Sequence, residues 1–165
     1  MSSEKSIQRI AVVGTGVIGA SWAALFLAQG FDVVATDPAP NAEANLHRYI
    51  NAAWPEFSVL GISPHASPDR VVFTRDLKQA VAKADFVQEN GPERPDLKIQ
   101  LFAEMDSAGP ADAIIASSSS GLTMSVMQSA CAHPETLPHR SSIQPTTRNS
   151  PGGVGGRSQN VTRNY

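Results

Sequence analysis

The sequence predicts an α/β fold of the Rossmann type, a doubly wound parallel sheet. Three observations support it. Apolar runs of strand length alternate with helical segments over residues 6–135. The first run, Ile7–Val13, leads directly into the glycine motif G-T-G-V-I-G at 14–19. The second run ends at Asp37, which lies 18 residues after Gly19, a spacing typical of dinucleotide-binding domains.

The elements follow from local patterns along the chain. Ile7–Val13 is contiguously apolar near its end, as in a parallel strand that is covered on both faces. The next helix, Ala20–Gln29, is rich in Ala and Leu, and Gly30 is its expected C-terminal cap. The later elements are expected as strand Phe31–Thr36, helix Asn41–Leu60 interrupted near Pro55, loop Gly61–Arg70, strand Val71–Phe73, helix Leu77–Lys83, strand Asp85–Gln88, helix Pro95–Met105 and strand Ala113–Ala116.

Charge divides the chain into two parts. Residues 1–135 carry all 15 acidic residues and 9 of the 13 Lys and Arg residues, whereas residues 136–165 carry no acidic residue and four arginines. Only five of the last 30 residues are hydrophobic. We therefore expect a globular domain at residues 6–135 and a disordered tail at residues 136–165.

Composition excludes several classes of protein. No apolar run approaches the roughly 18 residues of a membrane span, and the N-terminus lacks the apolar core of a secretory signal. A cytoplasmic protein with no membrane partner is expected. The single cysteine, Cys131, excludes a disulfide framework and a cysteine-based zinc site, and no metal is expected. The acidic body and the scattered tail arginines argue against a nucleic-acid partner.

The glycine motif favours a dinucleotide cofactor. Gly14 permits the tight turn out of the strand, Gly16 lets a pyrophosphate approach the backbone, and Gly19 allows close packing of helix on sheet. The helix N-terminus then offers free N–H groups to the phosphates. Asp37 is expected to bind the adenine ribose and to repel the extra phosphate of NADP, so NAD is the predicted cofactor. Two alternatives stay open on these residues: FAD, and a glycine-rich turn that binds nothing.

Four blocks of sequence together resemble a known family. They are VGTGVIGASWAALFLAQGFDVVATD, ADFVQENGPERPDLKIQLFAEMD, AIIASSSSGL and ACAHPE. Over about residues 7–135 the chain resembles the N-terminal domain of the L-3-hydroxyacyl-CoA dehydrogenase family, with the L-carnitine-oxidising branch most similar and a gulonate-oxidising branch near it. The resemblance implies hydride transfer from a small 3-hydroxy substrate, such as a 3-hydroxyacyl-CoA or L-carnitine, to NAD. It also implies a homodimer held by a helical C-terminal domain.

The resemblance also implies site residues. The implied cofactor contacts are Gly14, Thr15, Gly16, Val17, Ile18, Gly19, Asp37, Glu89 and Lys98. Ser120 falls on the serine that contacts the substrate hydroxyl. Taken alone, these residues have simpler interpretations: Glu89 as a strand-end cap or a solvated acid, Lys98 as part of a solvated helix face, and residues 117–120 as a polar loop.

The family uses a histidine as its general base and a glutamate that orients this histidine. Neither residue is found at the expected place in this sequence. His139 lies nearby, but in the unrelated context LPHRSS. We hypothesise that residues 136–165 are family sequence read in the wrong frame, because dropping the first base of the Thr136 codon permits the reading GHPFNPPHVIPLVELVG. The sheet is then expected to stop before its sixth strand, without the helical C-terminal domain. The alternative function is a catalytically inactive NAD-binding fragment.

Overall fold

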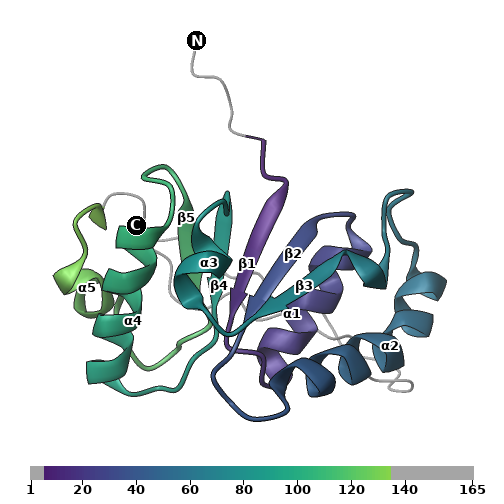
Figure 1. Cartoon of the computed structure of the whole chain (residues 1–165), viewed down its shortest axis with the longest axis horizontal. Helices are drawn as coiled ribbons and strands as arrows, with labels where there is room; N and C mark the ends of the chain where they lie inside the picture. The colour runs from purple at the N-terminus through teal and green to yellow at the C-terminus, as the bar shows by residue number, and fades with distance from the viewer. Residues whose placement is uncertain (1–5, 135–165) are drawn as a thin grey trace, which may run out of the picture.

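Five short strands form one parallel sheet in the order β3-β2-β1-β4-β5 (Figure 1). The strands are β1 (Arg9–Val13), β2 (Asp32–Thr36), β3 (Val71–Thr74), β4 (Phe86–Glu89) and β5 (Ile114–Ser117). The computed structural model describes residues 6–134. The predicted tail at 136–165 lies outside the described residues.

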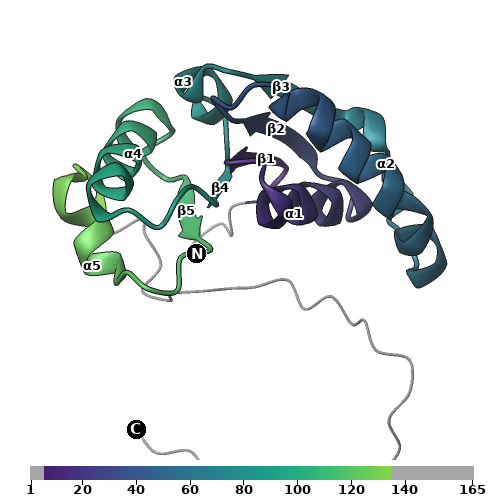
Figure 2. The same ribbon diagram turned by 90° about the horizontal axis from the view of Figure 1, so that it is seen from below.

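Helices connect the strands and cover the sheet. They are α1 (Val17–Ala28), α2 (Ala42–Leu60), α3 (Leu77–Val81), α4 (Pro95–Ala108) and α5 (Met124–Met127), with 3₁₀ turns η1 (Pro68–Arg70) and η2 (Gln128–Ala130). In both views α1 and α2 lie on the side of β2 and β3, whereas α4 and α5 lie beside β5 (Figures 1 and 2). None of these described helices is both long and apolar enough to cross a membrane.

Each face of the sheet has its own apolar core, because successive side chains of a strand point to opposite faces. Ile10 and Val12 of β1 belong to a core shared with α1 and α2. Ala11 and Val13 belong to a second core, which α3, α4 and α5 complete. All four side chains are buried, so β1 is covered on both faces, as its contiguous apolar sequence predicts.

The centre of the sheet is the point where the strand order reverses. β1 pairs with β2 on one side and with β4 on the other. The chain leaves β1 toward one face and leaves β4 toward the other, so the two loops diverge at the carboxyl ends of these strands. Crevices at such a switch point are the usual ligand sites of open α/β sheets.

The predicted fold class is confirmed, and every predicted strand and helix has a counterpart that overlaps it. The predicted interruption near Pro55 is wrong, because α2 continues through this residue. Pro55 and Asn51, whose carbonyl loses its N–H partner, are both exposed, so water can satisfy that carbonyl. Three short elements have no predicted counterpart: η1, which lies at the end of the predicted loop Gly61–Arg70, and α5 and η2. Among the described residues there is no sixth strand and no further helical domain.

Candidate functional site

A cleft of about 900 Å³ opens at the carboxyl ends of the strands. Its walls come from the glycine motif, the residues after β2, the start of α3, the loop after β4 and one face of α4. Of the predicted site residues, Gly14, Gly16 and Asp37 line this cleft. The loop that follows Glu89 also lines it, but the other seven predicted residues do not: Thr15, Val17, Ile18, Gly19, Glu89, Lys98 and Ser120.

The glycine motif lines the cleft through Gly14 and Gly16. Gly14 has a φ of 86°, which favours glycine, and its N–H donates to the carbonyl of Thr36 at 2.8 Å. A Cβ on Gly19 would overlap the carbonyl oxygen of Gly14, so only glycine allows this approach of α1 to the loop. At Gly16 nothing lies within 4 Å of the Cβ position, which leaves backbone accessible from the cleft.

The first turn of α1 shares this open environment. Val17 and Ile18 are 74% and 45% exposed, although both side chains are apolar. The helix has no side-chain cap and no acidic residue in its first turn. An open glycine cradle with free N–H groups and a positive helix end fits the pyrophosphate of a dinucleotide.

Asp37 joins the end of β2 to the glycine motif. Its Oδ2 accepts the backbone N–H of Thr15 at 2.7 Å and the Thr15 hydroxyl at 3.1 Å. Its Oδ1 accepts the N–H of Ala39 at 2.8 Å. The carboxylate is therefore fixed in orientation at the edge of the cleft. Its bond to a ribose hydroxyl stays a prediction.

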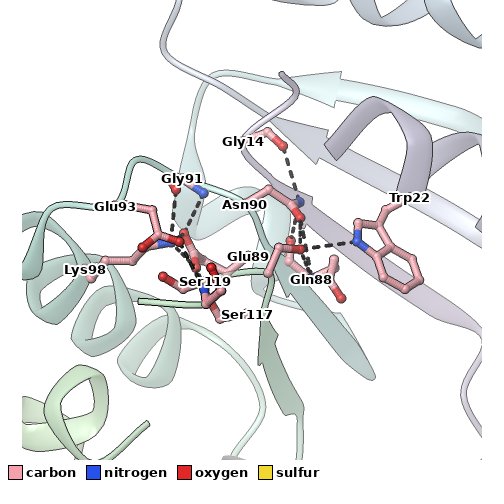
Figure 3. Close-up of polar contacts among 12 residues, drawn as sticks. Gly14, Trp22, Gln88, Glu89, Asn90, Gly91, Glu93, Lys98, Ser117 and Ser119 are labelled. Carbon is pink, nitrogen blue, oxygen red and sulfur yellow. Dashed lines mark hydrogen bonds and ion pairs between the residues drawn. The ribbon is translucent and has the colours of Figure 1, made fainter. Parts of the chain in front are cut away.

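Glu89 and Lys98 form a buried ion pair beneath the loop after β4 (Figure 3). Lys98 Nζ lies 2.8 and 2.7 Å from the two carboxylate oxygens of Glu89 and donates to the Gly91 carbonyl at 3.0 Å. Glu89 also accepts the N–H of Gly91 at 2.6 Å and the hydroxyl of Ser117 at 2.6 Å. The simpler interpretations of Glu89 and Lys98 as solvated groups are wrong. Their direct contact with a cofactor stays a prediction.

Ser118 is the centre of a second polar cluster, whose other members Trp22, Gln88 and Asn90 are labelled in Figure 3. Its hydroxyl accepts the indole N–H of Trp22 at 3.2 Å and the side-chain N–H of Gln88 at 2.9 Å. It donates to Asn90 Oδ1 at 2.7 Å. Asn90 Nδ2 in turn donates to the Gly14 carbonyl at 3.4 Å. Asn90 thus connects the serine-rich segment to the glycine motif.

Ser120 lies on the exposed loop after β5. Its backbone N–H donates at 3.1 Å to Oε1 of Glu93, in the loop after β4. The hydroxyl of the neighbouring Ser119 is buried close to this carboxylate and forms no hydrogen bond with it. The contact of Ser120 with a substrate hydroxyl stays a prediction.

Several residues of the site were not predicted from the sequence. Asn90 directly follows Glu89, yet only the acid of that pair was singled out. Glu93 and Trp22 lie in the blocks that carry the family resemblance but received no role. Arg75 lines the cleft together with Asp37 and has no local motif around it. Only the fold brings Arg75 to this place.

Comparison with known proteins identifies relatives over most of the chain. Residues 9–139 match the family described as "3-hydroxyacyl-CoA dehydrogenase, NAD binding domain". The chain is 50% identical over 137 residues to an L-carnitine dehydrogenase of Streptomyces coelicolor, covering 83% of this chain and 43% of that protein. It is 52% identical over 134 residues to an L-carnitine dehydrogenase of Bacillus cereus, covering 81% of this chain and 41% of that protein. The chain thus spans less than half the length of these relatives.

Solved structures share the same architecture. A 5-formyl-3-hydroxy-2-methylpyridine 4-carboxylic acid 5-dehydrogenase, an NAD⁺-dependent dismutase, superposes with a TM-score of 0.73 at 31% identity, covering 80% of this chain and 43% of that one. A 3-hydroxybutyryl-CoA dehydrogenase from Escherichia coli superposes with a TM-score of 0.72 at 23% identity, covering 81% of this chain and 29% of that one. The second comparison supports the fold alone.

Proposed function

This chain belongs to the 3-hydroxyacyl-CoA dehydrogenase family through its NAD-binding domain, and we propose that it serves the NAD-dependent oxidation of L-carnitine or a similar small 3-hydroxy compound. The observation that carries the proposal is the cleft at the switch point, in which the glycine motif and Asp37 lie side by side. L-carnitine is favoured over a 3-hydroxyacyl-CoA because relatives at about half identity are L-carnitine dehydrogenases.

The cofactor of this domain is NAD. Gly16 and the first turn of α1 would hold its pyrophosphate through backbone N–H groups, with Gly14 forming the tight turn before them. Asp37 would accept hydrogen bonds from the adenine ribose, with its orientation already fixed by Thr15. When bound, NAD supplies the acceptor for the hydride that leaves the substrate.

The substrate is proposed to bind beside the serine-rich loop after β5. There the hydroxyl of Ser120 would contact the substrate hydroxyl and orient the carbon that is oxidised. Asn90 supports this arrangement, since it hydrogen bonds both to Ser118 in the segment before Ser120 and to Gly14 in the cofactor cleft. The homodimer that the family resemblance implies is held by the helical C-terminal domain, so dimerisation of this 165-residue chain is not part of the proposal.

A second candidate function is an NAD-binding fragment without catalytic activity. One observation favours it: none of the three described histidines lines the cleft. His47 lies on α2, His65 lies near Asp32 at the amino ends of β1 and β2, and His133 follows η2. Among the described residues, the cleft therefore contains no imidazole that could act there as a general base.

Two assays on the purified 165-residue chain distinguish these functions. Fluorescence titration with NADH reports on cofactor binding, and absorbance of NADH formed from NAD⁺ and L-carnitine reports on turnover, with 3-hydroxybutyryl-CoA as the comparison substrate. Binding together with turnover of L-carnitine supports the dehydrogenase proposal. Binding without turnover of either substrate supports the inactive fragment. Absence of NADH binding contradicts both.

A further inference from the structure

Glu93 reaches from the loop after β4 to the loop after β5 (Figure 3). Its Oε1 accepts the backbone N–H of Ser120 at 3.1 Å. Its Oε2 lies so close to Gly121 that a Cβ there would be 2.9 Å away. The residue after Ser120 therefore leaves room for this carboxylate because it has no side chain.

The electrostatics of Glu93 indicate that the carboxylate form makes this contact. The pKa of Glu93 is lowered by the Ser119 hydroxyl, then by the Ser120 N–H and, more weakly, by the Gly121 N–H and the charge of Lys98; partial desolvation opposes them. Of the neighbouring cations, Arg94 pairs with Asp96, and Lys98 is bonded to Glu89 and Gly91. The acceptor capacity of Glu93 is thus directed at the serine loop.

The loop that carries Glu93 is itself anchored to the cofactor cleft. Gly91 is held through its N–H by Glu89 and through its carbonyl by Lys98. Gly91 and Pro92 line the cleft, and Glu93 follows them directly. One short segment therefore contacts the cleft at one end and the serine loop at the other.

We propose that Glu93 is a positioning residue, which fixes Ser120 relative to the cofactor cleft by bonding its backbone N–H. The proposal rests on the proposed function, since it gives Ser120 its contact with the substrate hydroxyl. The stabilisation that the carboxylate charge gives this bond is fully present above the ordinary carboxyl pKa of 4.5. This stabilisation is lost as the pH falls through the lowered pKa of Glu93 in the folded protein.

The test uses amide NMR of the full 165-residue chain and its variants. Glu93→Gln keeps an oxygen acceptor but removes the titrating charge, whereas Glu93→Ala removes the acceptor. Glu56→Gln, at an exposed position on α2, is the matched control for loss of a carboxylate. Two signals are followed: the pH titration of the Ser120 and Gly121 amides, and the shifts that NADH causes at Thr15 and Ser120.

The pH experiment needs no cofactor. In the wild type and Glu56→Gln, we expect the Ser120 and Gly121 amides to titrate with a midpoint below 4.5, and in Glu93→Gln we expect this midpoint to disappear. In Glu93→Ala the Ser120 amide should exchange with solvent about two- to fivefold faster, the range for an exposed charged contact. An unchanged midpoint in Glu93→Gln, or unchanged exchange in Glu93→Ala, overturns the proposal.

The NADH experiment separates this proposal from the proposed function. NADH is expected to shift both the Thr15 and the Ser120 amides of the wild type, and Glu93→Ala should retain the first shift and lose the second. A Ser120 shift that persists in Glu93→Ala overturns the positioning role. If NADH shifts neither amide of the wild type, the proposed function fails, while the pH experiment still decides whether Glu93 holds the loop.

Discussion

Lys98 Nζ lies within 2.8 Å of both carboxylate oxygens of Glu89, and the two side chains are 1% and 0% exposed. Burial of two charges is costly, so the pair persists only because each group has further partners. Lys98 also bonds the Gly91 carbonyl, and Glu89 bonds the Gly91 N–H and Ser117. This ion pair joins β4, α4, β5 and the rim of the cofactor cleft.

Replacement of Lys98 by Met should destabilise the domain strongly, because it leaves the Glu89 carboxylate buried without a counter-charge. We expect a loss of about 3–5 kcal/mol in the free energy of unfolding, measured in urea. The double variant Lys98→Met/Glu89→Gln should recover part of this loss. Lys78→Met, at an exposed site on α3, is the control and should change stability by less than about 0.5 kcal/mol. Equal effects at Lys98 and Lys78 would refute the buried pair.

Alanine at two glycines of the motif should affect different properties, NADH binding at Gly16 and stability at Gly19. Gly16→Ala meets open space and keeps a φ of −59° that any residue adopts, so it should fold with stability within about 1 kcal/mol of the wild type. It should weaken NADH binding by about tenfold or more, because the methyl group fills the cradle. Gly19→Ala overlaps the Gly14 carbonyl and should cost about 3 kcal/mol of stability. Thermal melts and NADH titration check both variants. Tight NADH binding by Gly16→Ala would contradict the proposal that the backbone at Gly16 binds the pyrophosphate.

Ser118 and Ser120, which are two positions apart in the chain, should differ in their contribution to stability. Ser118→Ala removes the hydroxyl that Trp22, Gln88 and Asn90 share, and it should cost about 1–3 kcal/mol in urea unfolding. Ser120→Ala, at an exposed position, should stay within about 0.5 kcal/mol of the wild type. A stable Ser118→Ala protein would show that the buried cluster contributes little.

The thiol of Cys131 should be unreactive at neutral pH. Burial, and then the charge of Asp106, raise its pKa from 9.0 to about 11. Because the folded state favours the protonated thiol, this group contributes stability below pH 9.0 that is lost as the pH rises toward 11. Alkylation by iodoacetamide at pH 8 should therefore be slower in the folded chain than in urea. Equal rates in the two conditions would contradict this protection.

Local sequence patterns were sufficient to locate the strands, the glycine motif and Asp37 in the chain. These features depend on neighbours in the chain: an apolar run, a glycine spacing and an acid at a strand end. Pro55 shows the limit of such patterns, because its effect on α2 depends on whether the freed carbonyl reaches water. The sequence alone has no direct signal for that exposure.

The partners of most site residues could not be predicted, because they depend on contacts between segments that are distant in the sequence. Trp22 and Ser118 are separated by 96 positions in the chain and meet only because the fold brings α1 to β4 and to the segment after β5. The ion pair of Lys98 with Glu89 also could not be read from the sequence, because it depends on how α4 packs against the sheet. Sequence patterns therefore located the serine loop and Glu89 without revealing which groups bind them.

The most direct test of the central claim is an NADH titration of the folded 165-residue chain, followed by NADH fluorescence. We predict saturable binding to one site, weaker binding of NADPH, and a loss of about tenfold or more in NADH affinity for Asp37→Ala, since a hydrogen-bonding carboxylate is removed. Asp69→Ala, at an exposed acid outside the cleft, should bind as the wild type does. No saturable binding at millimolar NADH, or equal affinity in Asp37→Ala, would contradict the assignment of this cleft to NAD.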